Sequence, residues 1–219
     1  MIKVDLHIHT TYSGDSEITP EQLVAQVQQS GIDCIAVVDH NTAEGSLKIA
    51  SMATPFQVIT GEEILTTEGE IIGFFLKETI PPGLSPEETI KLIHEQGALA
   101  CVPHPFDRYR SSAMQRDTLE RIVPLLDIIE ISNSRTIPFQ NMSQPEKFAA
   151  KHNKPAGAGS DAHIPAEIGR AYVEMGDFTN PEEFLSALRH GKVHRYQIGA
   201  ATQFRRLTGR LVRKLGGRR

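Results

Sequence analysis

Four short segments of this chain leave an apolar run and end in histidine or carboxylate side chains. In chain order they are VDLHIHT at 4–10, VVDH at 37–40, VPHP at 102–105 and GAGSDAH at 157–163. Three of the four begin on β-branched apolar residues, which is typical of a strand whose carboxyl end leaves the core and lines a site. The chain is therefore expected to fold so that several distant strand ends meet around one polar centre.

Strand-like and helix-like segments alternate along the whole chain. The segments 19–31 and 85–97 each carry an N-cap residue, a proline at the first helical position and a terminal glycine. The intervening apolar runs give roughly seven strands, including a hairpin over 56–76. The predicted helices lie at 19–31, 43–53, 85–97, 115–123, 143–153 and 180–191.

This alternation predicts parallel strands joined by right-handed crossovers. The strands are almost continuously apolar, so both faces of the sheet are expected to be covered. A doubly wound sheet gathers its polar residues at one switch point, whereas here they end strands throughout the chain. Because only a closed barrel brings all these ends to one centre, we predict an α/β fold, a (β/α) barrel with seven strands rather than eight.

The length and composition suit one domain with a full core, since the chain has 219 residues, of which 39% are hydrophobic. Asp5, His7 and His9 interrupt the only early apolar run, so we expect neither a signal peptide nor a membrane span, and we predict a cytoplasmic protein. Cys34 and Cys101 lie in apolar runs and are expected to be buried free thiols.

The charge is unevenly distributed between the body of the chain and its end. Seven of the 23 basic residues and none of the 27 acidic ones fall in 205–219, which leaves a net charge of −11 on 1–204. We therefore predict a barrel domain over 1–204 and a basic tail over 205–219. The tail is typical either of an amphipathic helix that contacts nucleic acid or another polyanion, or of a disordered basic end.

Two pairs of candidate ligands share the same spacing. His7 and His9, and later Asp161 and His163, are two residues apart, so each pair points to one side of its strand and can reach one cation. Each candidate alone has an ordinary alternative: a chance pair, a turn aspartate or a hydrogen-bonded core histidine. Five of the nine histidines fall at predicted strand ends, however, which favours a metal site. The candidates are His7, His9, Asp15, His40, Glu63, His104, Asp161 and His163.

The series DLHIHT, Asp15, VVDH, GEE, PHP and GSDAH, in this order up to about residue 170, resembles the PHP family of metal-dependent phosphoesterases. The resemblance implies a distorted (β/α)7 TIM-like barrel of the PHP type that holds two or three divalent ions. The implied ligand sets are His7, His9, Glu63 and Asp161 for one centre, Glu63 and His104 for a second, and Asp15, His40 and His163 for a third.

The chain departs from that family at one position. Many family members carry a histidine where this chain has Glu70, in the run Glu70-Ile71-Ile72-Gly73. We predict that Glu70 replaces this histidine as a ligand of the second centre. The alternative is a hairpin residue that faces water, beside a weakened centre.

Mixed imidazole and carboxylate ligands suit Mn²⁺, Zn²⁺ or Fe²⁺. Metal ions held close together lower the pKa of a shared water and clamp the attacking and leaving oxygens of a displacement. The predicted function is therefore hydrolysis of a phosphoester by a metal-bound hydroxide. The residues predicted to take part in catalysis are Asp15, His40, Arg135 and His163.

Arginine side chains on the same barrel face suit a phosphate group, because they bind it through two parallel hydrogen bonds. The candidates are Arg108, Arg110, Arg135 and Arg170, each of which is equally typical of a solvated loop residue. Arg135 is the preferred candidate because it is nearest to a predicted strand end.

Three functions are consistent with this sequence. The first is a phosphoesterase that acts on a small phosphorylated metabolite, a nucleotide or an oligonucleotide. The second is a metal-dependent amidohydrolase, since one barrel with metals can support both reactions. The third is a non-catalytic metal-bound module that docks to nucleic acid through its tail, which the nearly complete ligand set argues against.

Overall fold

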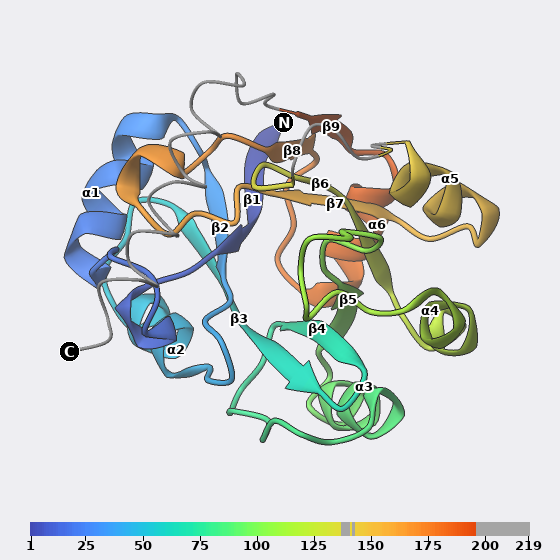
Figure 1. Ribbon diagram of the computed structural model, residues 1–219. Coiled ribbons are helices and arrows are strands. Elements are labelled where there is room, and N and C mark those ends of the chain that lie inside the picture. Colours follow the sequence, from blue (N-terminus) through green and yellow to red (C-terminus); the bar gives the residue numbers. More distant parts are fainter. Residues whose placement is uncertain (137–140, 142, 196–219) are drawn as a thin grey trace.

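The computed structural model describes residues 1–136, 141 and 143–195 (Figure 1). The tail over 205–219 and the proposed boundary at 204 lie outside these residues. One sheet runs through the described part, in the order β7-β6-β5-β4-β3-β2-β1-β8-β9. Its strands are β1 (Ile2–Ile8), β2 (Cys34–Val37), β3 (Gln57–Thr66), β4 (Gly69–Phe74), β5 (Leu99–Val102), β6 (Ile128–Asn133), β7 (Ala156–Gly159), β8 (Tyr172–Met175) and β9 (Lys192–His194).

Strands β1 to β7 curl into a nearly closed barrel, with the helices on the outside (Figure 1). The barrel closes where the chain beyond β7 returns to β1. There the Asp161 N–H donates to the carbonyl of His7 at 2.7 Å, and the His9 N–H donates to the carbonyl of Ala162 at 3.0 Å. The predicted α/β barrel of seven strands is thus confirmed.

The helices cover the barrel much as the sequence predicts. The helix starts predicted for the segments 19–31 and 85–97 are confirmed, because Thr19 with Gln22 and Ser85 with Glu88 each form a complete capping box. None of the helices in the described ranges has the length and apolar character of a membrane span. The helices are α1 (Pro20–Ser30), α2 (Glu44–Ala50), α3 (Pro86–Glu95), α4 (Arg116–Ile122), α5 (Gln144–Lys151) and α6 (Pro181–Arg189), with 3-10 turns η1 (Thr11–Ser13) and η2 (Pro165–Glu167).

The hairpin predicted over 56–76 is confirmed by the antiparallel pair β3–β4, but the expectation of parallel strands is wrong at β8. β4 is antiparallel to both β3 and β5, β8 is antiparallel to β1, and β9 is antiparallel to β8. The β3–β4 hairpin turns over in two residues, which reverses the chain direction. Between β7 and β8 the chain forms only the short η2 turn, without the long helical crossover that a parallel return requires.

Apolar residues fill the barrel and the space under the helices. Ile90 and Ile93 of α3 are buried against Ile64 and Ile71 of the hairpin, in one continuous cluster. Cys34 and Cys101 are buried and free, as predicted. With this packing on the outer faces, the polar strand ends are left to meet at one end of the barrel.

We expect Gly159→Ala to destabilise the protein strongly, because β7 and β1 touch at this residue. A Cβ added to Gly159 would lie 2.2 Å from the Cβ of His7, so the backbone has to move. The expected loss in the free energy of unfolding is about 3 kcal/mol, the upper end for overpacking. Urea unfolding followed by circular dichroism measures it. Gly176→Ala is the matched control, because its added Cβ would lie 3.7 Å from the nearest atom. Equal unfolding midpoints for the two variants would contradict this account of barrel closure.

Candidate metal centre

His7 and His9 lie side by side at the carboxyl end of β1 and are fully buried. Their Nε2 atoms are 3.0 Å apart. The Nδ1 atom of His7 lies 3.0 Å from Glu130 Oε1, and that of His9 lies 3.0 Å from Ser13 Oγ. Since the Ser13 hydroxyl donates to Asp39 Oδ1 at 2.7 Å, its oxygen accepts from His9 Nδ1–H. Both rings therefore turn their Nε2 atoms towards each other.

Two facing imidazole nitrogens need a cation or a proton between them. Burial alone lowers the pKa of His7, but the charges of Glu130, Glu63 and Asp161 raise this pKa well above its usual value. The pKa of His9 is instead well below its usual value, through burial and the nearby His163. A single proton between the two Nε2 atoms satisfies both rings. Because a metal ion binds only the neutral ring, it would take the position of this proton, which makes the pair suited to hold one.

Glu63 connects the histidines that come from different strands. Its Oε1 atom lies 2.9 Å from His104 Nε2 and 3.6 Å from His7 Nε2, and its Oε2 atom lies 3.1 Å from His40 Nδ1. Burial raises the pKa of this carboxyl, but His7, His104 and His40 outweigh burial and hold the pKa well below its usual range. Glu63 is therefore an ionised carboxylate at the centre of the cluster.

Asp161 presents one carboxylate oxygen to the cluster. Its Oδ2 atom accepts from Arg110 and, at 3.2 Å, from Asn133 Nδ2. Its Oδ1 atom is buried, accepts no hydrogen bond within the described residues, and lies 3.5 Å from His9 Nε2. Although burial raises the pKa of Asp161, Arg110 and His7 bring it well below its usual range. An ionised, buried oxygen without a hydrogen-bond donor is suited to a metal ion.

His104 and Glu70 close the side of the cluster next to the hairpin. The Oε2 atom of Glu70, on β4, lies 3.5 Å from His104 Nε2. Burial and the neighbouring charge of Glu63 raise the pKa of Glu70. His104 has a φ of 29° and Asp161 a φ of 53°, values that non-glycine residues rarely adopt. Such strained residues are common at functional sites.

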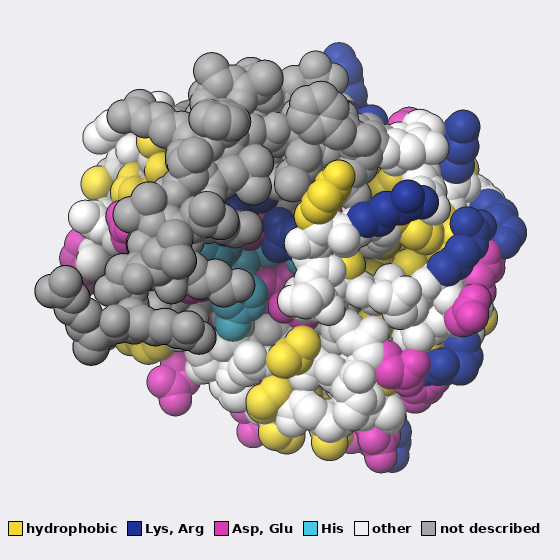
Figure 2. Space-filling view, in the orientation of Figure 1, with side chains coloured by type: hydrophobic (Ala, Val, Ile, Leu, Met, Phe, Trp, Pro, Cys, Tyr) yellow, Lys and Arg dark blue, Asp and Glu magenta, His cyan; other side chains and the backbone are white. Residues whose placement is uncertain are grey.

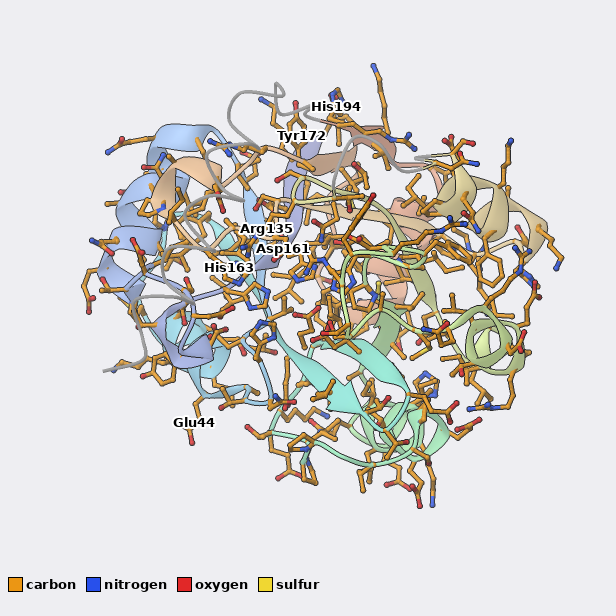
Figure 3. All side chains as sticks on the ribbon, viewed as in Figure 1. Glu44, Arg135, Asp161, His163, Tyr172 and His194 are labelled. Atoms are coloured by element: carbon orange, nitrogen blue, oxygen red, sulfur yellow. The ribbon has the colours of Figure 1, made fainter. Side chains whose placement is uncertain are left out.

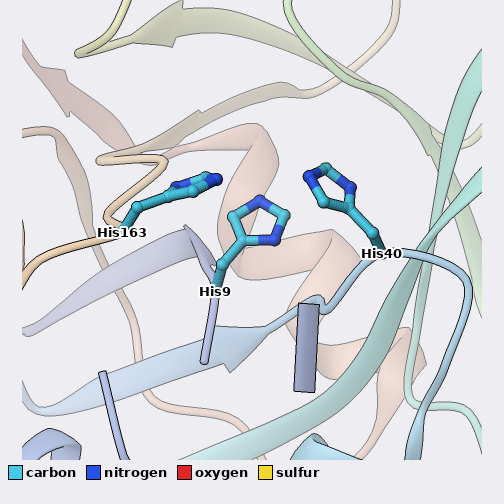
Figure 4. A group of neighbouring side chains, drawn as sticks. All are labelled: His9, His40 and His163. Atoms are coloured by element: carbon cyan, nitrogen blue, oxygen red, sulfur yellow. The ribbon is translucent and has the colours of Figure 1, made fainter. Parts of the chain in front are cut away.

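The other side of the cluster is open to solvent. The Oδ2 atom of Asp15 lies 3.2 Å from His163 Nε2 and 3.7 Å from His40 Nε2. The rings of His40 and His163 each lie 4.4 Å from the ring of His9, so that three imidazoles converge (Figure 4). The side chain of Asp15 is 57% exposed, whereas those of His9 and Glu63 are buried. In Figure 2 histidine side chains reach the surface beside acidic and basic ones.

All nine predicted ligands thus lie in one continuous cluster, built from six barrel strands (β1 to β5 and β7) and the loops that follow them. Three triads within it have nitrogen or oxygen atoms within 4.8 Å of one another, which is close enough to share a divalent ion. These triads are His9, His40 and His163; His7, His9 and Glu63; and His40, Glu63 and Glu70.

Two of the four candidate arginines contact this cluster. Arg110 binds Asp161, and Arg135 Nη1 lies 3.5 Å from Asp161 Oδ1. Figure 3 shows Arg135, Asp161 and His163 close together. Arg108 is exposed, and Arg170 lies 4.0 Å from Glu167.

Two further residues, Ser13 and Glu130, orient the cluster and were not among the predicted site residues. Glu130 is buried on β6 and accepts from three donors: His7 Nδ1, the His104 N–H at 2.6 Å and Asn133 Nδ2 at 3.2 Å. The available signal was an acidic residue between the isoleucines of the run 128–131, since buried carboxylates need partners.

The chain is similar to several known proteins. A family model described as PHP domain matches residues 5–133, and one described as PHP-associated matches residues 143–193. Two uncharacterized proteins of Methanocaldococcus jannaschii are similar to the chain: one is 36% identical over 86% of this chain and 79% of that protein, the other 44% identical over 61% and 82%. A 5'-3' exoribonuclease of Haemophilus influenzae is 30% identical over 51% of this chain and 45% of that protein.

The fold is also found among solved structures. A two-domain protein from Bacteroides vulgatus, described as containing a predicted PHP-like metal-dependent phosphoesterase, superposes with a TM-score of 0.66 at 17% identity, over 93% of this chain and 68% of that one. The chain belongs to the PHP domain family. This membership, together with the buried histidines and carboxylates, supports the predicted enzyme class, a metal-dependent hydrolase.

We expect Glu130→Gln to weaken metal binding without unfolding the protein. All three partners of Glu130 are donors, so an amide NH₂ group has to face one of them, and His7 loses its fixed orientation. The expected loss of metal affinity is roughly 10–100-fold, as for other residues that orient a ligand histidine. Competition with a chromophoric chelator measures it. Glu174→Gln, which alters a surface pair with His194, is the control. An unchanged affinity would mean that Glu130 only supports the fold.

Proposed function

We propose that the protein hydrolyses a phosphoester bond of a small phosphorylated metabolite, a nucleotide or an oligonucleotide at this cluster. One observation carries the proposal: nine imidazole and carboxylate groups converge, and two arginines adjoin them at Asp161. The carboxylates and imidazoles suit divalent cations, and the guanidinium groups suit the anionic oxygens of a phosphoester.

In this proposal the nine residues hold two to three divalent ions, with Mn²⁺, Zn²⁺ and Fe²⁺ as the candidates. When bound, such ions activate water and polarise the phosphoryl oxygens. His7, Glu63 and Asp161 form the buried side of the cluster, and Asp15, His40 and His163 form the side that is open to substrate. His9 is buried and contacts both sides. Glu130 and Ser13 hold the His7 and His9 rings in the tautomer that leaves Nε2 for a ligand.

Arg135 is the residue we propose to bind the substrate phosphate. Its Nη1 atom lies 3.4 Å from the Asp161 carbonyl, and its side chain remains 16% exposed. It can therefore turn a second N–H group towards an anion at the open end. Arg110 is instead engaged with Oδ2 of Asp161, so its role is to aim the other oxygen into the cluster.

The two arginines favour an anionic phosphoester over the neutral amide of an amidohydrolase. Among the similar proteins, the exoribonuclease of Haemophilus influenzae suggests an oligonucleotide as one substrate class. The basic tail, which lies outside the described residues, would attract such a polyanion in a salt-dependent way.

A substrate screen of the metal-loaded protein tests the proposal. The panel contains a chromogenic phosphomonoester, a phosphodiester, a 5'-phosphorylated oligonucleotide and an N-acyl amide. We expect turnover of at least one phosphoester, its loss in a strong chelator and its return with added Mn²⁺ or Zn²⁺. Hydrolysis of the amide alone would favour the amidohydrolase, and the absence of all turnover with metal bound would favour the non-catalytic module.

A further inference from the structure

We propose that the cluster is chemically divided, so that its two ends retain different metals. The imidazole-rich end, formed by His9, His40 and His163, would retain Zn²⁺. The carboxylate-rich end, formed by Glu63, Glu70 and His104, would retain Mn²⁺. The inference rests on the proposed function in that it concerns the same metal-loaded site, and it specifies a mixed-metal centre.

The imidazole-rich end offers three ring nitrogens to one point. The nitrogens of its three histidines lie within 4.8 Å of one another, and its ring centroids are 4.4, 4.4 and 6.1 Å apart. The rings come from β1 and from the loops after β2 and β7, so the barrel itself holds them together (Figure 4). Asp15 adds one carboxylate oxygen from the solvent side. Three imidazoles with one carboxylate form a donor set that suits Zn²⁺.

The carboxylate-rich end reverses this balance. Glu63 and Glu70 supply carboxylate oxygens there, and His104 supplies one imidazole, with its Nε2 atom 2.9 Å from Glu63 and 3.5 Å from Glu70. Glu70 is held in place by the hairpin and by its N–H, which donates to the carbonyl of Ser112 at 3.1 Å. Its side chain is 11% exposed, so it does not face bulk water. Carboxylate oxygens favour the harder ions Mn²⁺ and Mg²⁺.

Which metal each end retains depends on the ratio of its affinities for Zn²⁺ and Mn²⁺ rather than on either affinity alone. Zn²⁺ binds more tightly than Mn²⁺ to almost any set of nitrogen and oxygen ligands. The difference in affinity between Zn²⁺ and Mn²⁺ is largest where the ligands are imidazoles and smallest where carboxylates replace them. With scarce Zn²⁺ and abundant Mn²⁺, the first zinc ion therefore goes to the imidazole-rich end and Mn²⁺ keeps the other.

The test uses the full chain, stripped of metal with a chelator and then incubated with one equivalent of Zn²⁺ and a large excess of Mn²⁺. After desalting, elemental analysis gives the Mn:Zn ratio. Anomalous diffraction at the two absorption edges of a crystal of the same sample locates each ion. We expect Zn²⁺ beside His9, His40 and His163, and Mn²⁺ beside Glu70.

The Glu70→His variant should bind Zn²⁺ in place of Mn²⁺, because an imidazole then replaces a carboxylate. The retained Mn:Zn ratio should fall roughly tenfold. Glu78→His is the matched control, since it adds a histidine at an exposed position four residues after β4. If the Glu70→His variant fails to fold, Glu70→Gln keeps the shape of the side chain and should also reduce the retained Mn²⁺.

Two results would overturn the inference: both metals mixed at both ends, or a Glu70 variant with the Mn:Zn ratio of the wild type. Failure of the proposed function has a different signature. Metals divided as expected, in a protein that cleaves no phosphoester, would refute the hydrolytic proposal and leave the division of metals intact.

Discussion

Asp161→Asn should remove bound metal and reduce kcat/KM by roughly a thousandfold or more, which corresponds to about 4 kcal/mol of transition-state stabilisation. The carboxylate is fully buried, and its Oδ1 atom, which accepts no hydrogen bond from the described residues, lies 3.5 Å from His9 Nε2 and 3.9 Å from His7 Nε2. An amide has nearly the same shape but carries no charge. The variant should therefore fold, but its side chain no longer neutralises the charge of a cation between His7 and His9. His7→Ala removes another predicted ligand of the same ion, so it should also remove bound metal and reduce kcat/KM.

Elemental analysis of the purified variants and kcat/KM on a chromogenic phosphoester measure these changes. Asp117→Asn is the control, since Asp117 is an exposed residue in the first turn of α4. Full metal content and rate in Asp161→Asn, or wild-type activity in a strong chelator, would be incompatible with the proposed centre.

Arg135→Ala should keep the metal and lose roughly 100-fold in kcat/KM, the size of effect seen when one charged donor to a developing anion is removed. Arg135 approaches Asp161 only at 3.4–3.5 Å, so its removal leaves Arg110 and Asn133 to hold that carboxylate. The loss should therefore appear with phosphoesters while metal affinity stays nearly constant. Arg135→Lys should recover part of the rate, since lysine restores the charge but not the paired N–H groups.

Steady-state kinetics together with metal titration separates the two possible roles of Arg135. Arg108→Ala, at an exposed position of another loop on the same barrel face, should stay within about twofold of the wild type. A parallel loss of metal in Arg135→Ala would assign Arg135 to the support of Asp161, and an unchanged rate would leave the phosphate to another residue.

Local patterns were sufficient to predict most of the architecture. The capping boxes at Thr19 and Ser85 depend on residues three positions apart, so they can be recognised without knowledge of the fold. The spacing of His7 and His9 implies a shared side of one strand for the same reason. The antiparallel placement of β8 was missed, because strand direction depends on which strand is nearest in space and not on the segment itself.

The sequence by itself determined the chemistry of this protein: which side chains end the strands, how they pair at short range, and hence that a divalent metal suits them. Only the tertiary structure decided which distant groups meet. Glu130 orients His7 across 123 positions, and Arg110 binds Asp161 across 51. The physical reason is that barrel closure brings strand ends within hydrogen-bonding distance regardless of their separation in sequence. Contacts of this kind follow from strand order and register, which no single segment encodes.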